Sequence, residues 1–417
     1  MAAEPATEPV SPATATPPAP VDLTTVAREW TRIGCVGFGG PPAHIVLLRE
    51  LCVARRGWMT AQEFEDAVAT TNLLPGPGST QMALFCAWWV AGIRGALVGG
   101  AGFILPGLAA ILLLAVVFLA GAPPDWIRGA GAGAGAAVAA VAVQAAWTLL
   151  RPGWMRVRGP ARARWLGYLG AGAVAAAAAG PWTVVFLLAC GAVELAFRAG
   201  SRPGDPPGPA PVVSRSSSTG AAVHGWPLLP AVIAAVTASG GLLAVAWVAF
   251  KVGALSYGGG FVVIPLMQAD AVGHHHWMTE TQFSSAVALG QVTPGPVTHT
   301  VAAVGYAAHG LVGALVAAVV AFTPSFSFIV LGAGRFDRLR ADQRVRAFLD
   351  GAGPAAIGAI LGAVVPLVAA LQETWQLPVL AGAAVVLLLA GRGVVLTLLL
   401  AGGAGALVGV GGGPLPT

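Results

Sequence analysis

Charged residues are scarce in this chain of 417 residues, of which Asp, Glu, Lys and Arg make up only 9%. Soluble domains carry charge on about a quarter of their residues, so the composition excludes a soluble domain. Lysine occurs only at Lys251, and the formal net charge of +5 therefore comes from arginine. The arginines flank apolar stretches, which membrane topology explains better than nucleic-acid binding does. We expect no nucleic acid among the partners.

Cysteines and catalytic motifs are also sparse. The four cysteines lie far apart and form no Cys-x-x-Cys pair, so they indicate neither a zinc site nor a disulfide framework. The sequence contains no Gly-x-Ser-x-Gly, no Walker loop and no His-Glu-x-x-His. We therefore expect no enzyme activity, no metal and no cofactor, and no ATP-driven pumping by this chain alone.

Hydrophobic runs are what the chain has in abundance. Hydrophobic residues make up 56% of it, and the mean hydropathy is +0.78. A helix needs about 20 apolar residues to cross a bilayer, and runs of that kind recur throughout the sequence. We predict an all-α polytopic membrane protein with about ten to twelve membrane segments. A soluble helical core would need polar outer faces, which these runs lack.

The chain repeats itself 219 residues later. Trp58-Met59-Thr60 recurs as Trp277-Met278-Thr279, and a Pro-Gly-Pro motif recurs in the same register. Chance similarity between apolar segments gives scattered Leu and Val matches and does not align such motifs. We therefore predict two homologous helical halves.

Composition also sets the domain boundaries. Residues 1–22 lack an apolar core and are predicted to be a disordered tail. Residues 198–226, rich in Pro, Gly and Ser, are predicted to be a cytoplasmic linker between the halves. The first membrane domain is then residues 23–197 and the second is residues 227–411, followed by a short tail at 412–417.

The two halves carry their arginine clusters in non-equivalent loops. The first cluster lies at 151–164 and the second at 335–346, one membrane segment out of phase with the first. Because cytoplasmic loops carry the arginine excess, the halves are predicted to be inverted relative to each other. Inversion needs an additional crossing, which we place in Pro227–Phe250. Arg55 and Arg56 fall on the outer side in this scheme, against the rule.

Inverted repeats with broken helices are typical of secondary transporters, whose substrate sites lie near the bilayer midplane. Glycine clusters mark the first predicted break in each half. Unwound backbone there exposes N–H groups, and a resuming helix presents its positive dipole end, so both favour oxyanion binding. Close helix packing through small residues is the alternative. The candidate residues are Phe38, Gly39 and Gly40 in the first half and Tyr257, Gly258, Gly259 and Gly260 in the second.

Pro-Gly-Pro motifs mark the second break in each half, because proline lacks an N–H and interrupts a helix. The hydroxyl and amide groups beside them can donate to a ligand or cap the helix that restarts. The imidazole that follows the second motif can also carry protons. The candidates are Asn72, Pro75, Gly76, Pro77, Ser79, Thr80 and Gln81, and in the second half Gln291, Pro294, Gly295, Pro296, Thr298 and His299.

Two cations occupy equivalent positions just before the glycine clusters. Arg32 corresponds to Lys251, which lies among apolar residues. An intramembrane cation is costly and marks a functional site by default, so both are candidate oxyanion ligands. Arg32 can alternatively reach an interface, and either cation can form a gating ion pair with Glu50 or Asp270.

With these motifs the chain resembles the chromate ion transporter family in its long two-domain form, over residues 24–410. The resemblance rests on the Phe-Gly-Gly-Pro stretch at 38–41, the tryptophans at 58 and 277, and both Pro-Gly-Pro motifs with the residues after them. It implies a multi-pass protein of the bacterial inner membrane that exports chromate and confers chromate resistance. It also implies sulfate as a related or competing anion. Gly37 and Pro42 depart from the family's usual pattern.

The membrane potential is consistent with export. A negative-inside potential favours the exit of a dianion by about 4.6 kcal/mol per 100 mV. We predict a secondary transporter that exports chromate, exchanging or competing with sulfate. The alternatives are an importer of sulfate or another oxyanion, an anion channel of the same architecture, and a membrane scaffold that transports nothing. A homodimer is an open alternative for its assembly.

Overall fold

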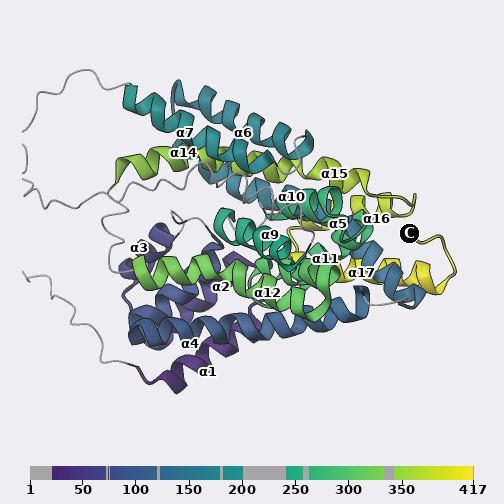
Figure 1. The fold of residues 1–417 in the computed structure, drawn as a ribbon, viewed down its shortest axis with the longest axis horizontal. Coiled ribbons are helices and arrows are strands. Elements are labelled where there is room, and N and C mark those ends of the chain that lie inside the picture. Colours follow the sequence, from purple (N-terminus) through teal and green to yellow (C-terminus); the bar gives the residue numbers. More distant parts are fainter. Residues whose placement is uncertain are drawn as a thin grey trace, which may run out of the picture.

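A computed structural model describes most of the chain as a bundle of helices (Figure 1). The described residues are 21–71, 74, 76–119, 123–178, 182–200, 241–256, 263–332 and 342–416. Within these ranges no strand is present. Residues 1–20 and residues 201–226 of the predicted linker lie outside them, whereas residues 198–200 of that linker are helical.

The helices follow one another in the same order in both halves. The first half comprises α1 (Leu23–Val36), α2 (Pro41–Arg49), the π-helical turn η1 (Glu50–Arg55), α3 (Ala61–Thr71), α4 (Gly78–Leu119), α5 (Asp125–Arg156), α6 (Ala161–Ala178) and α7 (Thr183–Gly200). The second half comprises α9 (Leu242–Leu255), α10 (Val263–Gln268), η4 (Ala269–His274), α11 (Glu280–Val292), η5 (Val297–His299), α12 (Thr300–Gly332), α14 (Gln343–Gly362), α15 (Val364–Ala369), α16 (Gln376–Ala384), η7 (Val385–Leu389) and α17 (Val394–Val410).

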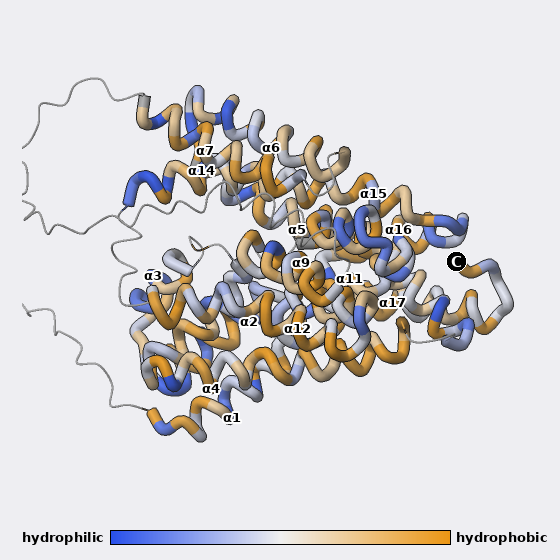
Figure 2. Tube along the Cα trace, viewed as in Figure 1, coloured by the Kyte–Doolittle hydropathy of each residue, from blue (hydrophilic) through white to orange (hydrophobic). Residues whose placement is uncertain are grey.

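Apolar residues cover these helices along their length, and polar residues gather toward the ends of the bundle (Figure 2). In the described part of the chain, α4, α5, α12 and α14 have the length and apolar composition needed to cross a membrane. The structure therefore confirms the predicted class, an all-α polytopic membrane protein.

The first glycine break is a hairpin tip and does not interrupt a straight crossing. Arg56, just past η1, lies 2.6 Å from Glu29 in α1, so the chain has returned alongside α1. The reversal uses Gly39 and Gly40, whose φ values of +98° and +73° are strained for other residues. α2 then starts at Pro41, where a missing N–H costs no helical hydrogen bond.

The first Pro-Gly-Pro break is the tip of a second hairpin, formed by α3 and the start of α4. Trp89 of α4 donates its indole N–H to the carbonyl of Trp58, just before α3, at 3.2 Å. At the other end of the hairpin the Thr71 hydroxyl lies 3.7 Å from the Met82 sulfur. Gly76 has a φ of +123° at the tip.

α4 itself folds back after its short first arm. The backbone leaves the helical region at Ala91 and Gly92, with φ values of −144° and +62°. A Cβ on Gly99 would lie 2.5 Å from the Cβ of Ala87, although twelve residues of straight helix would span about 18 Å. α4 is therefore a short arm followed by a long arm of opposite direction.

The second half repeats these reversals at equivalent positions. Lys251 of α9 lies 2.6 Å from Asp270 of η4, which closes the third hairpin. The fourth hairpin turns at Gly295, with φ +89°. α12 folds back at His309 and Gly310, with φ values of −145° and +59°.

Capping accounts for the threonine that ends both copies of the Trp-Met-Thr motif. Thr279 accepts a hydrogen bond from the Gln282 N–H, and the Gln282 side chain accepts one from the Thr279 N–H. Thr60 and Glu63 form the same reciprocal pair at the start of α3. Such capping boxes satisfy the free N–H groups of a helix start.

The long arms of α4 and α12 pack together and point opposite ways. In Figure 1, α4 ends at the right, beside the start of α5, whereas α12 ends at the left, the end of the bundle at which α14 also starts. The equivalent long arms of the two halves therefore run in opposite directions.

The halves also exchange their remaining helices. α5 of the first half packs against α16 and α17 of the second, while α14 of the second half packs against α6 and α7 of the first. A Cβ on Gly129 would lie 2.2 Å from the Gly405 carbonyl oxygen, and one on Gly358 would lie 1.9 Å from the Leu169 oxygen. Only glycine allows backbones this close, so these positions fix the exchange.

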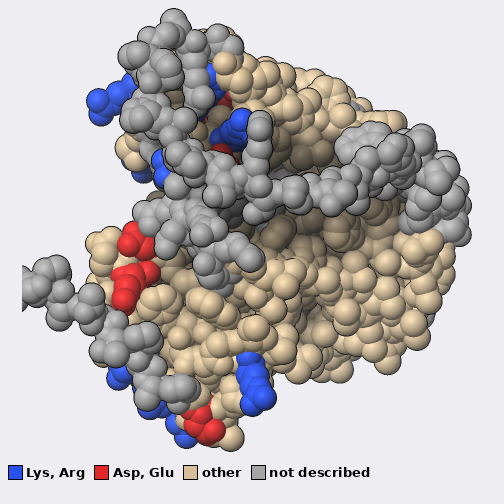
Figure 3. All heavy atoms as spheres, turned by 60° about the vertical axis from the view of Figure 1, so that its left-hand side comes forward, with Lys and Arg blue, Asp and Glu red and all other residues tan. Residues whose placement is uncertain are grey.

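Charged side chains gather at the left-hand end of the bundle, which Figure 3 turns toward the viewer. The start of α1, the end of α7 and the start of α14 all lie at this end in Figure 1.

Because the first hairpin returns, Arg55 and Arg56 lie at the end where α1 begins. They share that end with Arg164 of the first basic cluster, as the positive-inside rule requires. The exception noted in the sequence arose from treating the glycine break as part of a crossing. The additional crossing expected in Pro227–Phe250 lies mostly outside the described residues.

Candidate functional site at the hairpin tips

The four hairpin tips meet in two crosswise contacts. The Gly295 N–H donates to the Gly37 carbonyl at 2.9 Å, and the Gly76 N–H donates to the Ser256 carbonyl, also at 2.9 Å. Gly76 and Gly295 are equivalent in the repeat, as are Gly37 and Ser256. The two contacts therefore use equivalent residues, with the donor and acceptor halves exchanged. This is the pattern that a two-fold relation between the halves produces.

The tips press against the long arms at points where a side chain would not fit. A Cβ on Gly107, in the long arm of α4, would lie 2.1 Å from the Pro294 carbonyl oxygen. A Cβ on Gly253, just before the third tip, would lie 2.0 Å from the Ala321 oxygen in α12. The tips of one half thus rest on the other half and on the middle of the long arms.

Hydroxyl and amide groups surround Gly76. A Cβ on Gly76 would lie 2.6 Å from Nε2 of Gln81 and 3.3 Å from Oγ of Ser325. Ser325 and Ser256 are wholly buried, and neither hydroxyl has a hydrogen-bond partner within the described part of the chain. Buried polar groups are nearly always paired, so unpaired donors at a hairpin tip point to a ligand.

Two histidines flank the other contact. His44 and His299 are both wholly buried. Nε2 of His44 lies 2.9 Å from the Gly37 carbonyl oxygen, the same oxygen that accepts from Gly295. A Cβ on Gly295 would lie 3.1 Å from Cε1 of His299.

Most of the predicted second-break residues that the structure describes are buried here. They are Gly76, Pro77, Ser79, Thr80, Gln81, Gln291, Gly295, Pro296, Thr298 and His299, with Pro294 partly buried. The hydroxyls of Thr80 and Thr298 have no hydrogen-bond partner among the described residues, so they do not cap a helix end there. Of the glycine-break residues, Phe38 is 45% exposed, and Gly39 and Gly40 are also accessible. The predicted residues Asn72, Pro75, Tyr257, Gly258, Gly259 and Gly260 lie outside the described residues.

The two predicted cations lie on hairpin arms, each beside a carboxylate. Arg32 is 55% exposed and lies 3.7 Å from Glu29. Lys251 is nearly buried, 2.6 Å from Asp270. Asp270 is therefore the partner of Lys251, one of the two alternatives that the sequence offered. The polar groups that the structure describes at the tips themselves are neutral hydroxyl, amide, imidazole and backbone groups.

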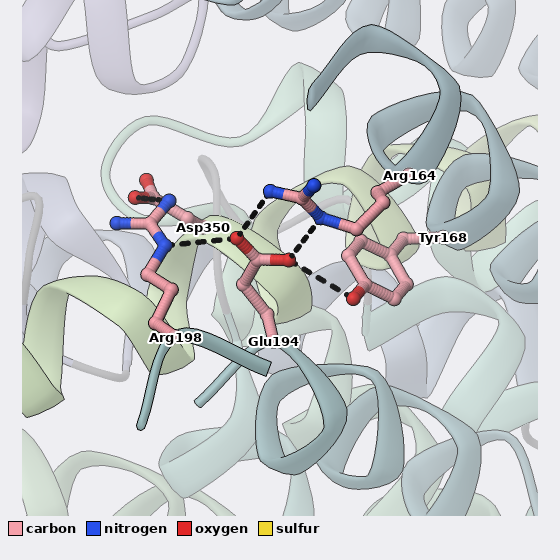
Figure 4. A network of polar contacts seen from close by, with 5 residues as sticks. All are labelled: Arg164, Tyr168, Glu194, Arg198 and Asp350. Atoms are coloured by element: carbon pink, nitrogen blue, oxygen red, sulfur yellow. Dashed lines mark hydrogen bonds and ion pairs between the residues drawn. The ribbon is translucent and has the colours of Figure 1, made fainter. Parts of the chain in front are cut away.

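A second buried polar cluster lies at the end of the bundle and joins the halves (Figure 4). Glu194 of α7 is almost fully buried and lies 3.0 Å from Arg164, 3.0 Å from the Tyr168 hydroxyl and 2.9 Å from Arg198. Arg198 also reaches Asp350 of α14 at 2.8 Å. Both oxygens of the Glu194 carboxylate have partners in this cluster, and the cluster joins α6, α7 and α14.

Three tip residues were absent from the predicted site: His44, Ser256 and Ser325. Ser256 and Ser325 are polar residues within apolar segments, which is the signal that marks them in the sequence. His44 also lies in an apolar segment, but nothing in the sequence indicates that α2 folds back and brings it to the break.

Comparisons with known proteins find relatives that match both halves of the chain. The model of the chromate transporter family matches residues 24–195 and 243–409, one region in each half. The chromate transport protein of Cupriavidus metallidurans is 30% identical over 352 residues, which are 83% of this chain and 82% of that protein. A probable chromate transport protein of Synechococcus elongatus is 28% identical over 346 residues, 83% of this chain and 84% of its own.

A shorter relative matches a smaller part of the chain. The uncharacterized transporter YwrA of Bacillus subtilis is 38% identical over 127 residues, which are 30% of this chain and 64% of YwrA. YwrA is therefore less than half as long as this chain. No solved structure matches. Since the family model covers most of both halves, the chain belongs to the chromate transporter family.

Proposed function

We propose that this protein is a secondary transporter of the bacterial inner membrane that exports chromate, with the oxyanion bound where the hairpin tips meet. The observation that carries the proposal is the reciprocal pair of tip contacts, Gly295 to Gly37 and Gly76 to Ser256. Because these contacts join the halves at the tips, one half can rock about them and open the site to one side at a time. Alternating access requires that property.

The donors at the tips suit a tetrahedral oxyanion. The hydroxyls of Ser256 and Ser325 and the amide of Gln81 are neutral, and all of them can donate hydrogen bonds. A dianion held by neutral donors in a dry site is recognised without a fixed counterion. The dianion can therefore leave such a site more easily than it could leave a site in which buried cations pair with it.

The inverted relation of the halves is part of this proposal. The opposite directions of α4 and α12 support it, as do the hairpins that meet tip to tip. Under this arrangement the first two hairpins enter from the cytoplasmic face and the last two from the outer face. Their tips would then face each other near the midplane.

Export is the direction that the membrane potential favours for a dianion, by about 4.6 kcal/mol per 100 mV. Sulfate has the same tetrahedral shape and charge, so we propose that it competes for the tips or exchanges with chromate. A channel is disfavoured by the closed tips, which touch each other and both long arms.

Transport by the purified protein in proteoliposomes tests the proposal. Vesicles loaded with chromate and given an imposed potential should release it only when they contain the protein. Sulfate or chromate on the opposite side should accelerate the exchange of labelled chromate. Release without any counter-transport would favour a channel, and equal release from protein-free vesicles would overturn transport altogether. In a chromate-sensitive cell, expression should lower chromium accumulation if export is the direction.

A further inference from the structure

We propose that His44 and His299 form a proton-binding pair that becomes charged only when an oxyanion occupies the hairpin tips. The inference rests on the proposed function and adds a second ligand, the proton, at one of the two tip contacts.

Geometry places both imidazoles at the Gly37–Gly295 contact. The Gly37 carbonyl accepts hydrogen bonds from the Gly295 N–H and from Nε2 of His44, both at 2.9 Å. His299 lies against Gly295, and a Cβ on Gly107 would lie 2.6 Å from Cε1 of His299. The two histidines come from different halves of the chain, and neither has any exposed surface.

Their nitrogens are left with capacity to bind protons. A carbonyl oxygen only accepts, so Nε2 of His44 donates and Nδ1 of a neutral His44 carries a free lone pair. Nδ1 of His44 has no partner in the described part of the chain, and neither nitrogen of His299 forms a well-aligned hydrogen bond there, although the backbone of Ile104 lies beside its ring. Three buried ring nitrogens without a well-aligned hydrogen bond are unusual for a structural role.

No carboxylate faces the pair from the described elements packed against it. Phe103 of α4 meets His44 edge-on, with ring centroids 5.0 Å apart, and Phe322 of α12 meets His299 in a similar way at 5.3 Å. Gly107, Pro294 and the backbone of Ile104 also border the pair. The buried carboxylates of the described residues are engaged elsewhere, Glu29 and Glu194 with arginines and Asp270 with Lys251.

This environment makes proton binding conditional on the oxyanion. A buried imidazolium without a counterion is strongly disfavoured, so the pair is neutral while the tips are empty. A dianion at the tips supplies the missing negative charge and favours the imidazolium form. The two imidazoles repel each other's charge, so we expect about one proton to be bound per oxyanion. The proton and the oxyanion then travel as one unit, and one proton halves the net charge that the transporter moves.

The repeat supplies matched variants for the test. The residues equivalent to His44 and His299 in the opposite halves are Val263 and Thr80. The other tip contact therefore has no imidazole at these positions, and His44→Val and His299→Thr each introduce the residue that the chain already uses at the equivalent place. His276 lies in an exposed loop, and its equivalent is Gly57, so His276→Gly is a matched control.

Proton uptake on chromate binding is the measurement. The full chain in lipid nanodiscs is titrated with chromate in weakly buffered solution with a pH indicator, above neutral pH, where chromate is a dianion. The unmodified protein and His276→Gly should take up about one proton per bound oxyanion. The double variant His44→Val/His299→Thr should bind chromate more weakly, because the linked proton is lost, and should take up no proton. Over the range in which the pair is neutral without the oxyanion, chromate affinity should rise about tenfold per unit fall in pH in the unmodified protein.

The outcomes separate the inference from the function on which it rests. Binding without proton uptake by the unmodified protein, or unchanged uptake by the double variant, would overturn the histidine pair and leave oxyanion transport intact. An absence of chromate binding by the unmodified protein would overturn both. If the double variant does not fold, the pH dependence of chromate affinity in the unmodified protein and in His299→Thr alone decides the matter. A flat dependence in the unmodified protein contradicts the inference.

Discussion

The backbone N–H of Gly76 lies 2.9 Å from the carbonyl oxygen of Ser256, although 180 residues separate them in the sequence. An equivalent hydrogen bond joins the backbone N–H of Gly295 to the carbonyl oxygen of Gly37. Each half thus supplies the donor for one contact and the acceptor for the other. Neither half can complete its own hairpin tips, and the proposed site exists only where the two halves meet.

Gly76→Ala is expected to disable transport. A Cβ would lie 2.6 Å from Nε2 of Gln81, and the φ of +123° is unfavourable for alanine. Strain of this kind costs about 1–3 kcal/mol, so we expect roughly a tenfold or greater loss of transport rate. Gly92→Ala is the control, since Gly92 also has a positive φ but open space where its Cβ would be. Equal effects of the two variants on proteoliposome transport would contradict a special role for the tip.

Lys251 and Asp270 are expected to behave as a coupled pair. Removing one partner leaves the other charge buried alone, at a cost of about 3–5 kcal/mol. Lys251→Met and Asp270→Leu should therefore each reduce the amount of folded protein. The double variant should recover both folding and transport, because the pair is neutral as a unit and Leu51 already occupies the equivalent of Asp270 in the first half. A double variant that folds and inserts but does not transport would instead place Lys251 among the ligands of the oxyanion.

Thiol labelling in intact cells tests the inversion. Ala54 and Gly273 are equivalent in the repeat and both are exposed at the open ends of their hairpins. In a background without the four native cysteines, Gly273→Cys should react with a membrane-impermeant reagent from outside. Ala54→Cys should react only after the cells are permeabilised. Labelling of both positions from the same side would falsify the inverted arrangement.

Glu194→Gln is expected to destabilise the bundle end without changing the tips. The substitution leaves Arg164 and Arg198 without their shared carboxylate, and we estimate a loss of about 2 kcal/mol because both guanidinium groups are partly solvated. Asp350 is 56% exposed in its pair with Arg198. Asp350→Asn should therefore change stability by no more than about 0.5 kcal/mol. Thermal unfolding in detergent measures both, and a larger loss for Asp350→Asn would contradict the burial argument.

Sequence patterns were sufficient for the helical class, the repeated motifs and most of the residues at the second break. Composition sets the class, because no soluble fold tolerates so few charges. Proline and glycine set the breaks, because they cannot continue a helix without cost. The positive φ values of Gly76 and Gly295 follow from those rules, whereas the burial of the Thr80 and Thr298 hydroxyls depends on tertiary contacts.

The direction in which the chain leaves each break could not be deduced from the sequence. A straight interrupted helix and a hairpin use the same glycines, and the difference depends on tertiary contacts such as Glu29 with Arg56. The ion pair of Lys251 with Asp270 and the place of His44 beside Gly37 depend on the same folding back. The exchange of α5 and α14 between the halves has no local signature either, because glycines spaced along a helix do not identify their partner.

The exchange of helices has a consequence for biogenesis. Gly129 of α5 meets Gly405 of α17, and 276 residues of chain separate them. At about 5–20 residues per second, tens of seconds pass between the synthesis of the two helices. During that time α5 lies in the membrane with its glycine face uncovered, held by lipid or by the insertion machinery. The protein therefore cannot mature domain by domain as it leaves the ribosome, and its first half becomes native only when the last helix has been inserted.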